Sequence, residues 1–240
     1  MSTDSLGDRM KRYEAVPRIS LMRRSCVILR VDGRAFHTFT RGMDRPFDQY
    51  LADAMVHAAA STAMEMQGFQ MGYHQSDEVS FFLHDFDRLE TDAWFGNDLQ
   101  KMVSITTSLF TGHFIDHIPE DLKAPAFDCR AFTLPHAEVA NYFLWRARDW
   151  HRNSLFIYAR TFFSDQELHG KGREELHEML HAIGKNWTTD VDEMFRNGTF
   201  FRRVREGDAD LKQTCHNVLP SFAAINEYLN DVCKVWDSSP

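Results

Sequence analysis

Apolar positions in the first part of the chain follow strand spacing and helix spacing in turn. Asp48 can cap a helix and Gly68 can end it, which brackets an apolar stripe at helical spacing. β-Branched and apolar runs, bounded by polar turns, predict the strands. The expected elements are a strand at 25–31, a helix at 48–67, strands at 69–74 and 79–83, a helix at 98–114 and a strand at 126–132.

This β-α-β-β-α-β order is that of the ferredoxin-like split βαβ unit, so the expected fold class is α+β. In that unit the first strand is central and lies beside the third strand, which runs antiparallel to the second. Asp32 ends the first predicted strand and Asp77 precedes the third. The topology therefore predicts that these two carboxylates meet at one edge of the sheet.

The remainder of the chain has mainly helical patterns. We expect a palm-like catalytic core with a basic N-terminal segment over residues 1–135, and a mainly helical region packed on it over residues 136–240. The helical segments expected in the second region are 136–163, 172–183, a short turn at 192–196 and a weaker segment at 222–236.

Composition is that of an ordinary globular protein of 240 residues, with 43% hydrophobic and 26% charged residues. A net charge of -8 argues against a generic nucleic-acid binder, which is usually basic. Arginine and lysine nevertheless cluster in residues 9–34 and 196–205. Such groups are often solvated surface charges, but they permit phosphate binding on an acidic protein.

No apolar run is long enough to cross a membrane, and the polar N-terminus lacks the apolar stretch of a signal peptide. We therefore expect a cytoplasmic protein with no membrane partner. The four cysteines are far apart and match no zinc spacing, which favours reduced thiols.

Asp32 and Asp77 are suitable ligands for magnesium, which prefers oxygen donors and keeps several waters or substrate phosphates. Two such ions can activate an attacking oxygen and stabilise a leaving one. Gly33 would let a triphosphate approach the backbone closely. Candidate phosphate partners are Arg34, Arg45, Lys101 and Arg130, and His37 is a candidate nucleotide contact. Each short motif alone is commonly a turn, so the hypothesis depends on their convergence.

Five segments together resemble the tRNA(His) guanylyltransferase family, in the same order along about the first 205 residues. They are Leu6-Gly7-Asp8-Arg9-Met10-Lys11, Val31-Asp32-Gly33-Arg34-Ala35-Phe36-His37, Gly72-Tyr73-His74-Gln75-Ser76-Asp77-Glu78-Val79-Ser80-Phe81, Phe127-Asp128-Cys129-Arg130, and Trp145-Arg146 through His151-Arg152-Asn153-Ser154-Leu155. The resemblance implies a polymerase-palm-like core with an appended helical region, and a homo-oligomer, often a tetramer.

The resemblance also implies the chemistry, which is nucleotide addition in the 3′-to-5′ direction at the 5′ end of tRNA. ATP or GTP first activates a 5′-monophosphate, and the 3′-hydroxyl of a nucleoside triphosphate then attacks the activated phosphate. It implies that Asp32, Asp77 and the Gly33 carbonyl bind two Mg²⁺ ions, with Glu78 supporting this catalytic site. The nucleotide and phosphate contacts that it implies are Asp32, Gly33, Arg34, Ala35, Phe36, His37, Arg45, Asp48, Ser76, Asp77, Lys101 and Arg130.

One departure from the family pattern lies in the long helix. Eukaryotic members carry His-Ile-Asn-Asn, a motif linked to strict handling of tRNA(His), whereas this chain carries His151-Arg152-Asn153-Ser154. In this respect the chain is more similar to the bacterial and archaeal guanylyltransferase-like proteins, which copy the opposite strand to restore missing 5′ nucleotides.

Two alternatives stay open at this point. A nucleotide cyclase-like palm enzyme would use the same carboxylates and need no RNA. A non-catalytic tRNA-binding protein would leave the cluster of Asp32, Asp77 and Glu78 without a purpose, because like charges repel one another.

Overall fold

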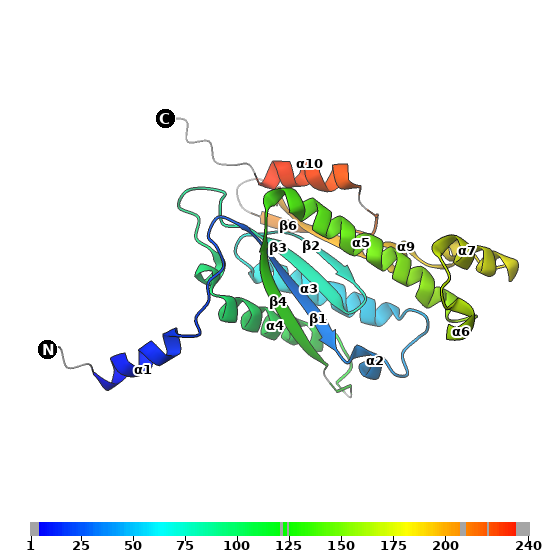
Figure 1. Cartoon of the computed structure of the whole chain (residues 1–240), viewed down its shortest axis with the longest axis horizontal. Helices are drawn as coiled ribbons and strands as arrows, with labels where there is room; N and C mark the ends of the chain where they lie inside the picture. The colour runs from blue at the N-terminus through cyan, green and yellow to red at the C-terminus, as the bar shows by residue number, and fades with distance from the viewer. Residues whose placement is uncertain (1–4, 121, 124, 207–209, 220, 234–240) are drawn as a thin grey trace.

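The computed structural model describes residues 5–120, 122–123, 125–206, 210–219 and 221–233. Figure 1 shows a twisted sheet with helices on both of its faces and α1 projecting away from the body. The strands are β1 Cys26–Arg34, β2 Phe69–Gln75, β3 Glu78–Leu83, β4 Ala126–Leu134, β5 Thr199–Glu206 and β6 Asp210–His216. The longer helices are α1 Leu6–Ala15, α3 Gln49–Glu65, α4 Leu99–Ile115, α5 His136–Ala159, α7 Arg173–Ala182 and α10 Phe222–Val232. The short helical segments are α2 Phe36–Phe39, η1 Trp94–Asn97, α6 Asp165–Leu168, α8 Trp187–Asp190 and α9 Glu193–Asn197.

The six strands form one sheet in the order β4-β1-β3-β2-β5-β6, with every neighbouring pair antiparallel. The predicted α+β class is confirmed, and β1, α3, β2, β3, α4 and β4 follow one another as expected. β1 is central and pairs with β3, so the end of β1 lies beside the start of β3.

The side chains on the two faces of β1 are packed in two different cores, because successive side chains point to opposite sides of a sheet. Val27, Leu29 and Val31 belong to a core that includes the inner faces of α3 and α4. Cys26 and Ile28 belong to a second core with α5 and α10. The helices α3 and α4 begin at Asp48 and Asp98, whose carboxylates accept the backbone N–H of residues 51 and 101. Those two caps set where each helix starts against the sheet.

The long helix α5 crosses the other face of the sheet and continues beyond it (Figure 1). Its first half packs on the sheet through Val139, Phe143 and Ala147. Its last turns form a third core with the short helices that follow, including Leu155, Trp187 and Leu180. α5 therefore joins the sheet to the small helical region.

Two strands were not predicted. β5 and β6 lengthen the sheet beyond β2, within a stretch that sequence patterns had described as mainly helical or without a defined structure. Phe200 and Phe201 point to opposite faces of the sheet and are buried in different cores, which anchors β5 beside β2. β1 also runs to Arg34 rather than ending at Val31, because Asp32, Gly33 and Arg34 pair with β4.

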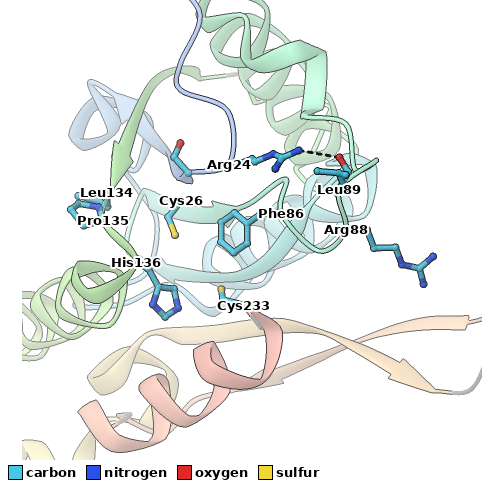
Figure 2. Close-up of a pocket in the computed structure, with 10 residues that line it drawn as sticks. Arg24, Cys26, Phe86, Arg88, Leu89, Leu134, Pro135, His136 and Cys233 are labelled. Carbon is cyan, nitrogen blue, oxygen red and sulfur yellow. Dashed lines mark hydrogen bonds between the residues drawn. The ribbon is translucent and has the colours of Figure 1, made fainter. Parts of the chain in front are cut away.

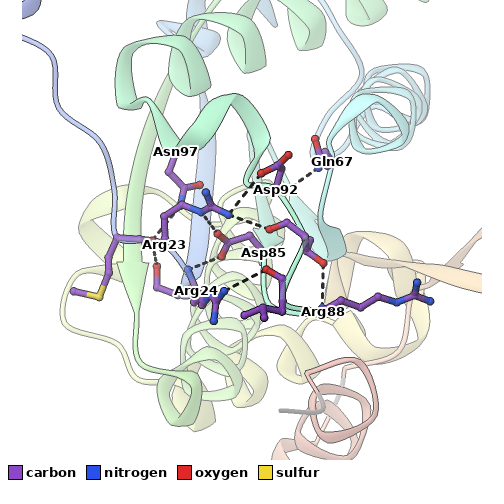
Figure 3. A network of polar contacts seen from close by, with 11 residues as sticks. Arg23, Arg24, Gln67, Asp85, Arg88, Asp92 and Asn97 are labelled. Atoms are coloured by element: carbon purple, nitrogen blue, oxygen red, sulfur yellow. Dashed lines mark hydrogen bonds and ion pairs between the residues drawn. The ribbon is translucent and has the colours of Figure 1, made fainter. Parts of the chain in front are cut away.

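The start of β1 is held by a polar network around Asp85, shown in Figure 3. The buried carboxylate of Asp85 accepts the Arg23 Nε–H at 2.6 Å and the Arg24 backbone N–H at 2.7 Å. Arg24 Nη2 and Arg23 Nη2 each donate to a carbonyl of the segment between β3 and η1. This network fixes the entry into the central strand.

Among the described residues, no helix is both long and apolar enough to cross a membrane.

Candidate active site

The end of β1 and the turn between β2 and β3 meet at one edge of the sheet, as the topology predicted. Asp32 is the direct cross-strand partner of Glu78. The backbone N–H of Gly33 donates to the Asp77 carbonyl oxygen at 3.0 Å. Ser76 has a φ of +50°, which makes the tight connection between the two strands. Two carboxylates that are 45 positions apart in the chain are thus held side by side.

Glycine is required at position 33 by the close approach of the chain to itself. A Cβ at this position would collide with the ring of Phe36, which is buried in the core beneath. Ala35, with a φ of +53°, then turns the chain away from the strand. The bare backbone of Gly33 therefore forms part of the wall of a cavity that Asp77 and the following loop also line.

Asp77 lies in an environment that opposes its negative charge. Burial raises its pKa above the ordinary value, and the nearby charges of Asp32 and Glu78 raise it further. Neighbouring half-buried carboxylates that repel one another are stabilised when a cation binds between them. Among the described residues no group of three or more His, Cys, Asp or Glu side chains could hold a metal. A cation here would take Asp32 and Asp77 from the protein and the rest of its ligands from backbone, substrate or water.

Glu78 is buried and both of its oxygens are already engaged. Arg146 of α5 donates from Nε to Oε1 at 2.7 Å and from Nη2 to Oε2 at 2.8 Å. Arg30 adds a weaker ion pair, with its Nε 3.8 Å from Glu78 Oε2. This bidentate geometry is the strongest form of carboxylate–arginine pairing, and it fixes α5 over the sheet. The geometry favours a positioning role for Glu78 rather than direct contact with a metal.

A cavity of about 530 Å³ is lined by Asp77 and by Gly33, the residue that follows Asp32, whereas Asp32 itself does not line it. Its wall includes these predicted site residues: Gly33, Ala35, Phe36, His37, Arg45, Asp48, Ser76 and Asp77. They come from the end of β1, from the loop that precedes α3, and from the β2–β3 turn. A volume of this size is typical of pockets for small organic ligands.

Asp48 shapes the loop that forms one side of this cavity. Its Oδ1 accepts the backbone N–H of Leu51 at 2.8 Å, and its Oδ2 accepts that of Asp44 at 3.0 Å. The carboxylate therefore caps α3 and closes the loop that carries Arg45. The predicted nucleotide contact at Asp48 is placed at the cavity, with its oxygens already accepting backbone hydrogen bonds.

Three predicted phosphate partners lie away from the cavity wall. Arg34 is exposed at the end of β1. Arg130 is exposed on the edge strand β4, directly opposite Arg30 and two positions from the cross-strand partner of Asp32. Lys101 lies in the first turn of α4, whereas the last turns of that helix pack against Phe36 beside the carboxylates. Lys101 is therefore at the far end of α4 from Asp32 and Asp77 in this chain.

Sequence patterns did not single out several residues that line or support the site. Arg146, the partner of Glu78, is a buried cation on the apolar face of α5, and that position could have indicated a buried carboxylate partner. His74, Phe47, Trp150 and Phe195 also line the cavity. No spacing rule predicts that the segments carrying Phe47, Trp150 and Phe195 approach the β2–β3 turn.

A second cavity, of about 410 Å³, lies at the other end of β1 and is shown in Figure 2. Its wall is largely apolar, with Cys26, Phe86, Leu134 and Cys233, and none of the described residues that line it is acidic. Burial raises the pKa of Cys26 to about 11 and also raises that of Cys233, so both thiols are protonated at neutral pH. Within the part of the chain that the structure describes, this cavity has no carboxylate for a metal, unlike the site at the opposite edge.

Comparison with known proteins agrees with this geometry. The family model for tRNAHis guanylyltransferase matches residues 7–135. The tRNA(His) guanylyltransferase of Schizosaccharomyces pombe is 30% identical over 215 residues, covering 81% of this chain and 78% of the relative. That of Neurospora crassa is 32% identical over 211 residues, covering 78% and 69%.

Two solved structures are similar along almost the whole chain. A bacterial tRNA(His) guanylyltransferase-like protein in complex with ATP has a TM-score of 0.87 and 35% identity, covering 97% of this chain and 99% of that one. Such a protein in complex with GTP has a TM-score of 0.79 and 34% identity, covering 95% and 99%. The chain therefore belongs to the tRNA(His) guanylyltransferase family and is an enzyme of that type.

Proposed function

We propose that this enzyme adds nucleotides to the 5′ end of tRNA in the 3′-to-5′ direction, with magnesium and nucleoside triphosphates. The observation that carries the proposal is the meeting of Asp32 and Asp77 beside a cavity large enough for a nucleotide. Family membership supports it, and similar proteins have been solved with ATP and with GTP. In this proposal the first four strands serve as a polymerase-type palm, and the region after residue 135 packs on it.

The residues at the sheet edge fit a magnesium site. Asp32, Asp77 and the Gly33 carbonyl would hold the metal, because hard cations take oxygen ligands and phosphates readily complete their coordination. When bound, two such ions would supply charge stabilisation for the phosphoryl oxygens and for the attacking and leaving oxygens. Burial and repulsion from Asp32 raise the pKa of Asp77, so a bound cation would stabilise the ionised form of this carboxylate.

Two arginines on the neighbouring strands β1 and β4 share one face of the sheet and are suited to bind a chain of phosphates. Arg30 and Arg130 are direct cross-strand partners, and like charges in that position repel one another. Arg30 Nε has no hydrogen-bond partner within the described part of the chain. A phosphate placed beside these side chains would relieve both costs, and fixed cations stabilise the charge that develops during phosphoryl transfer. Arg45 at the cavity, and Lys101 if a tRNA or a second subunit reaches it, are the further proposed contacts.

The reaction consists of two balanced transfers. The 5′-monophosphate of the RNA attacks the α-phosphate of ATP, which forms an adenylylated 5′ end and releases pyrophosphate. The 3′-hydroxyl of a second nucleoside triphosphate then attacks the RNA phosphate, and AMP leaves. Asp32 to His37 and Ser76 are proposed to orient the nucleotide at both steps, and Glu78 positions the site through its pair with Arg146.

We propose that base pairing of the incoming nucleotide with the opposite strand, rather than strict recognition of tRNA(His), decides which RNA is extended. The residues at 151–154 differ from the eukaryotic motif, and Arg152 and Asn153 are exposed on α5. We also propose a cytoplasmic enzyme that assembles as a tetramer, which light scattering in solution would test. A tRNA bound by several subunits would explain how contacts far from the cavity, such as Lys101, take part.

The test is incorporation into a 5′-monophosphorylated tRNA that lacks its first nucleotide, with magnesium, ATP and each nucleoside triphosphate in turn. Addition only of the nucleotide complementary to the opposite strand is the expected result. Guanylate addition regardless of that strand would instead indicate the tRNA(His) role. No addition, with triphosphate still bound, would overturn the proposal and favour a cyclase-like enzyme or a tRNA-binding protein.

A further inference from the structure

The cavity beside Asp77 has an aromatic section that the proposed phosphate chemistry does not explain. Phe47 stacks on Phe195, with ring centroids 4.9 Å apart and planes 10° from parallel. Trp150 of α5 meets Phe47 edge-on at 6.3 Å. All three line the cavity, and flat apolar walls of this kind suit a planar ring system.

Two residues that line this cavity each have a ring nitrogen without a partner. His74 Nδ1 and Trp150 Nε1 are buried, and neither has a hydrogen-bond partner among the residues that the structure describes. The two side chains are only 4% and 5% exposed. Leaving a buried polar group unpaired is costly, so a native protein usually keeps such a group for a ligand or a bound water.

The chemistry of each nitrogen is defined. His74 Nε2 lies 2.9 Å from the carbonyl oxygen of Ser76, which can only accept, so Nε2 carries the proton. Burial lowers the pKa of His74 to about 4, so the ring is neutral at pH 7 and Nδ1 is a bare acceptor. Trp150 Nε1 can only donate. These two cavity-lining residues thus hold one unpaired acceptor and one unpaired donor.

We propose that His74 and Trp150 read the base of the nucleoside triphosphate. His74 Nδ1 accepts from an amino or ring N–H group, and Trp150 Nε1 donates to a ring nitrogen or carbonyl. A purine fits best, because it offers both kinds of group and the larger surface to the aromatic wall. The proposal rests on the proposed function only in taking this cavity as the nucleotide site. It adds the residues that select the base.

Two variants separate the two contacts. In His74→Gln the side-chain amide can still donate to the Ser76 carbonyl, but the acceptor at Nδ1 is lost. Trp150→Phe keeps an aromatic ring in the wall and removes the donor together with part of the indole surface. His169→Gln is the matched control, since His169 is exposed and lies outside the cavity. At pH 7 all three variants should still melt cooperatively, and their affinity for inorganic tripolyphosphate should remain that of the unchanged enzyme.

Affinity is measured by calorimetry for ATP and for purine riboside triphosphate, which lacks the amino group and has no N–H donor on its base. His74→Gln should weaken ATP binding about tenfold and leave the analogue unchanged. Trp150→Phe should weaken both, because both bases keep their ring nitrogens as acceptors. Equal loss of ATP and analogue in His74→Gln, or no loss in either variant, overturns the proposal.

A measurement on the unaltered protein covers the case in which a variant fails to fold. With ¹⁵N-labelled enzyme, the indole N–H signals are followed on adding ATP or tripolyphosphate. One indole signal should move with ATP but not with tripolyphosphate, and the absence of such a signal overturns the proposal.

If the base contacts are found but no nucleotide is added to RNA, only the proposed function fails. Normal RNA extension with unaltered base affinity in both variants would reject this inference alone.

Discussion

The backbone N–H of Gly33 donates to the carbonyl oxygen of Asp77 at 3.0 Å, joining the end of β1 to the β2–β3 turn. This hydrogen bond lies outside the regular ladder between β1 and β3, which ends at the pair Asp32 and Glu78. It therefore fixes the turn on the strand end, and the positions of both carboxylates follow from the backbone rather than from side-chain contacts between them.

The first prediction concerns these two carboxylates. Asp32→Asn and Asp77→Asn should each reduce nucleotide addition by a factor on the order of 10²–10³ or more, because a preorganised group that serves the transition state is lost. The free energy of unfolding should stay the same or rise slightly in either variant, since one of two mutually repelling charges is removed. Single-turnover incorporation and urea unfolding are the measurements. Full turnover in either variant would reject the two-carboxylate site.

The second prediction concerns the buried pair of Glu78 and Arg146. Glu78→Gln or Arg146→Met should each lower the free energy of unfolding by about 3–5 kcal/mol, because a buried charge is left unpaired. The double variant should recover part of that loss. Arg152→Gln is the control, because its ion pair with Asp149 is exposed and should cost less than about 1 kcal/mol. Additive losses in the double variant would show that the pair is not coupled.

The third prediction compares two glycines with similar φ angles. Gly198 and Gly184 have φ of +71° and +73°, but only Gly198 has neighbours where a Cβ would lie. That Cβ would be 2.5 Å from both the His74 carbonyl oxygen and the Tyr73 hydroxyl. Gly184→Ala should cost about 1 kcal/mol from backbone strain, and Gly198→Ala about 3 kcal/mol or more. Equal losses in urea unfolding would show that β5 can move away from β2 without penalty.

The fourth prediction is a dependence of stability on pH. Burial lowers the pKa of His74 to about 4 in the folded protein, from an ordinary value of 6.5. The unfolded chain therefore binds a proton first as pH falls, so this group destabilises the fold progressively from about pH 6.5 down to about pH 4. Between pH 7 and pH 5 the loss is about 2 kcal/mol. His74→Gln should lack that part of the pH dependence, which urea unfolding at the two pH values would detect. An unchanged dependence in this variant would show that His74 does not titrate in this way.

Local patterns were sufficient for the part of the fold that assembles the site. The expected cap at Asp48 marked the start of α3, the helix expected from residue 98 matches α4, and the polar turn before Glu78 separated β2 from β3. Once that succession of elements was recognised, the position of Asp32 beside Asp77 followed from topology. This prediction held because the carboxylates are carried by backbone elements whose order leaves few arrangements.

Other features depend on contacts that no local pattern encodes. The charged context around Phe200 and Phe201 concealed β5, whose burial becomes evident only beside β2. The partner of Glu78 is 68 positions away, on a helix whose path across the sheet is set by its own core. Lys101 had the right charge and an expected helix, but helix polarity places it at the end away from the carboxylates.

The central place of β1 also has a consequence for how the chain folds. Both neighbours of β1 come later in the sequence, with β3 beginning at Glu78 and β4 at Ala126. During synthesis β1 emerges first and has no strand to pair with until much more of the chain has been made. Closing such long loops is slow, and an unpaired apolar strand is a site for misassociation. The strand that carries Asp32 is therefore expected to be the part of the nascent chain most in need of protection by chaperones.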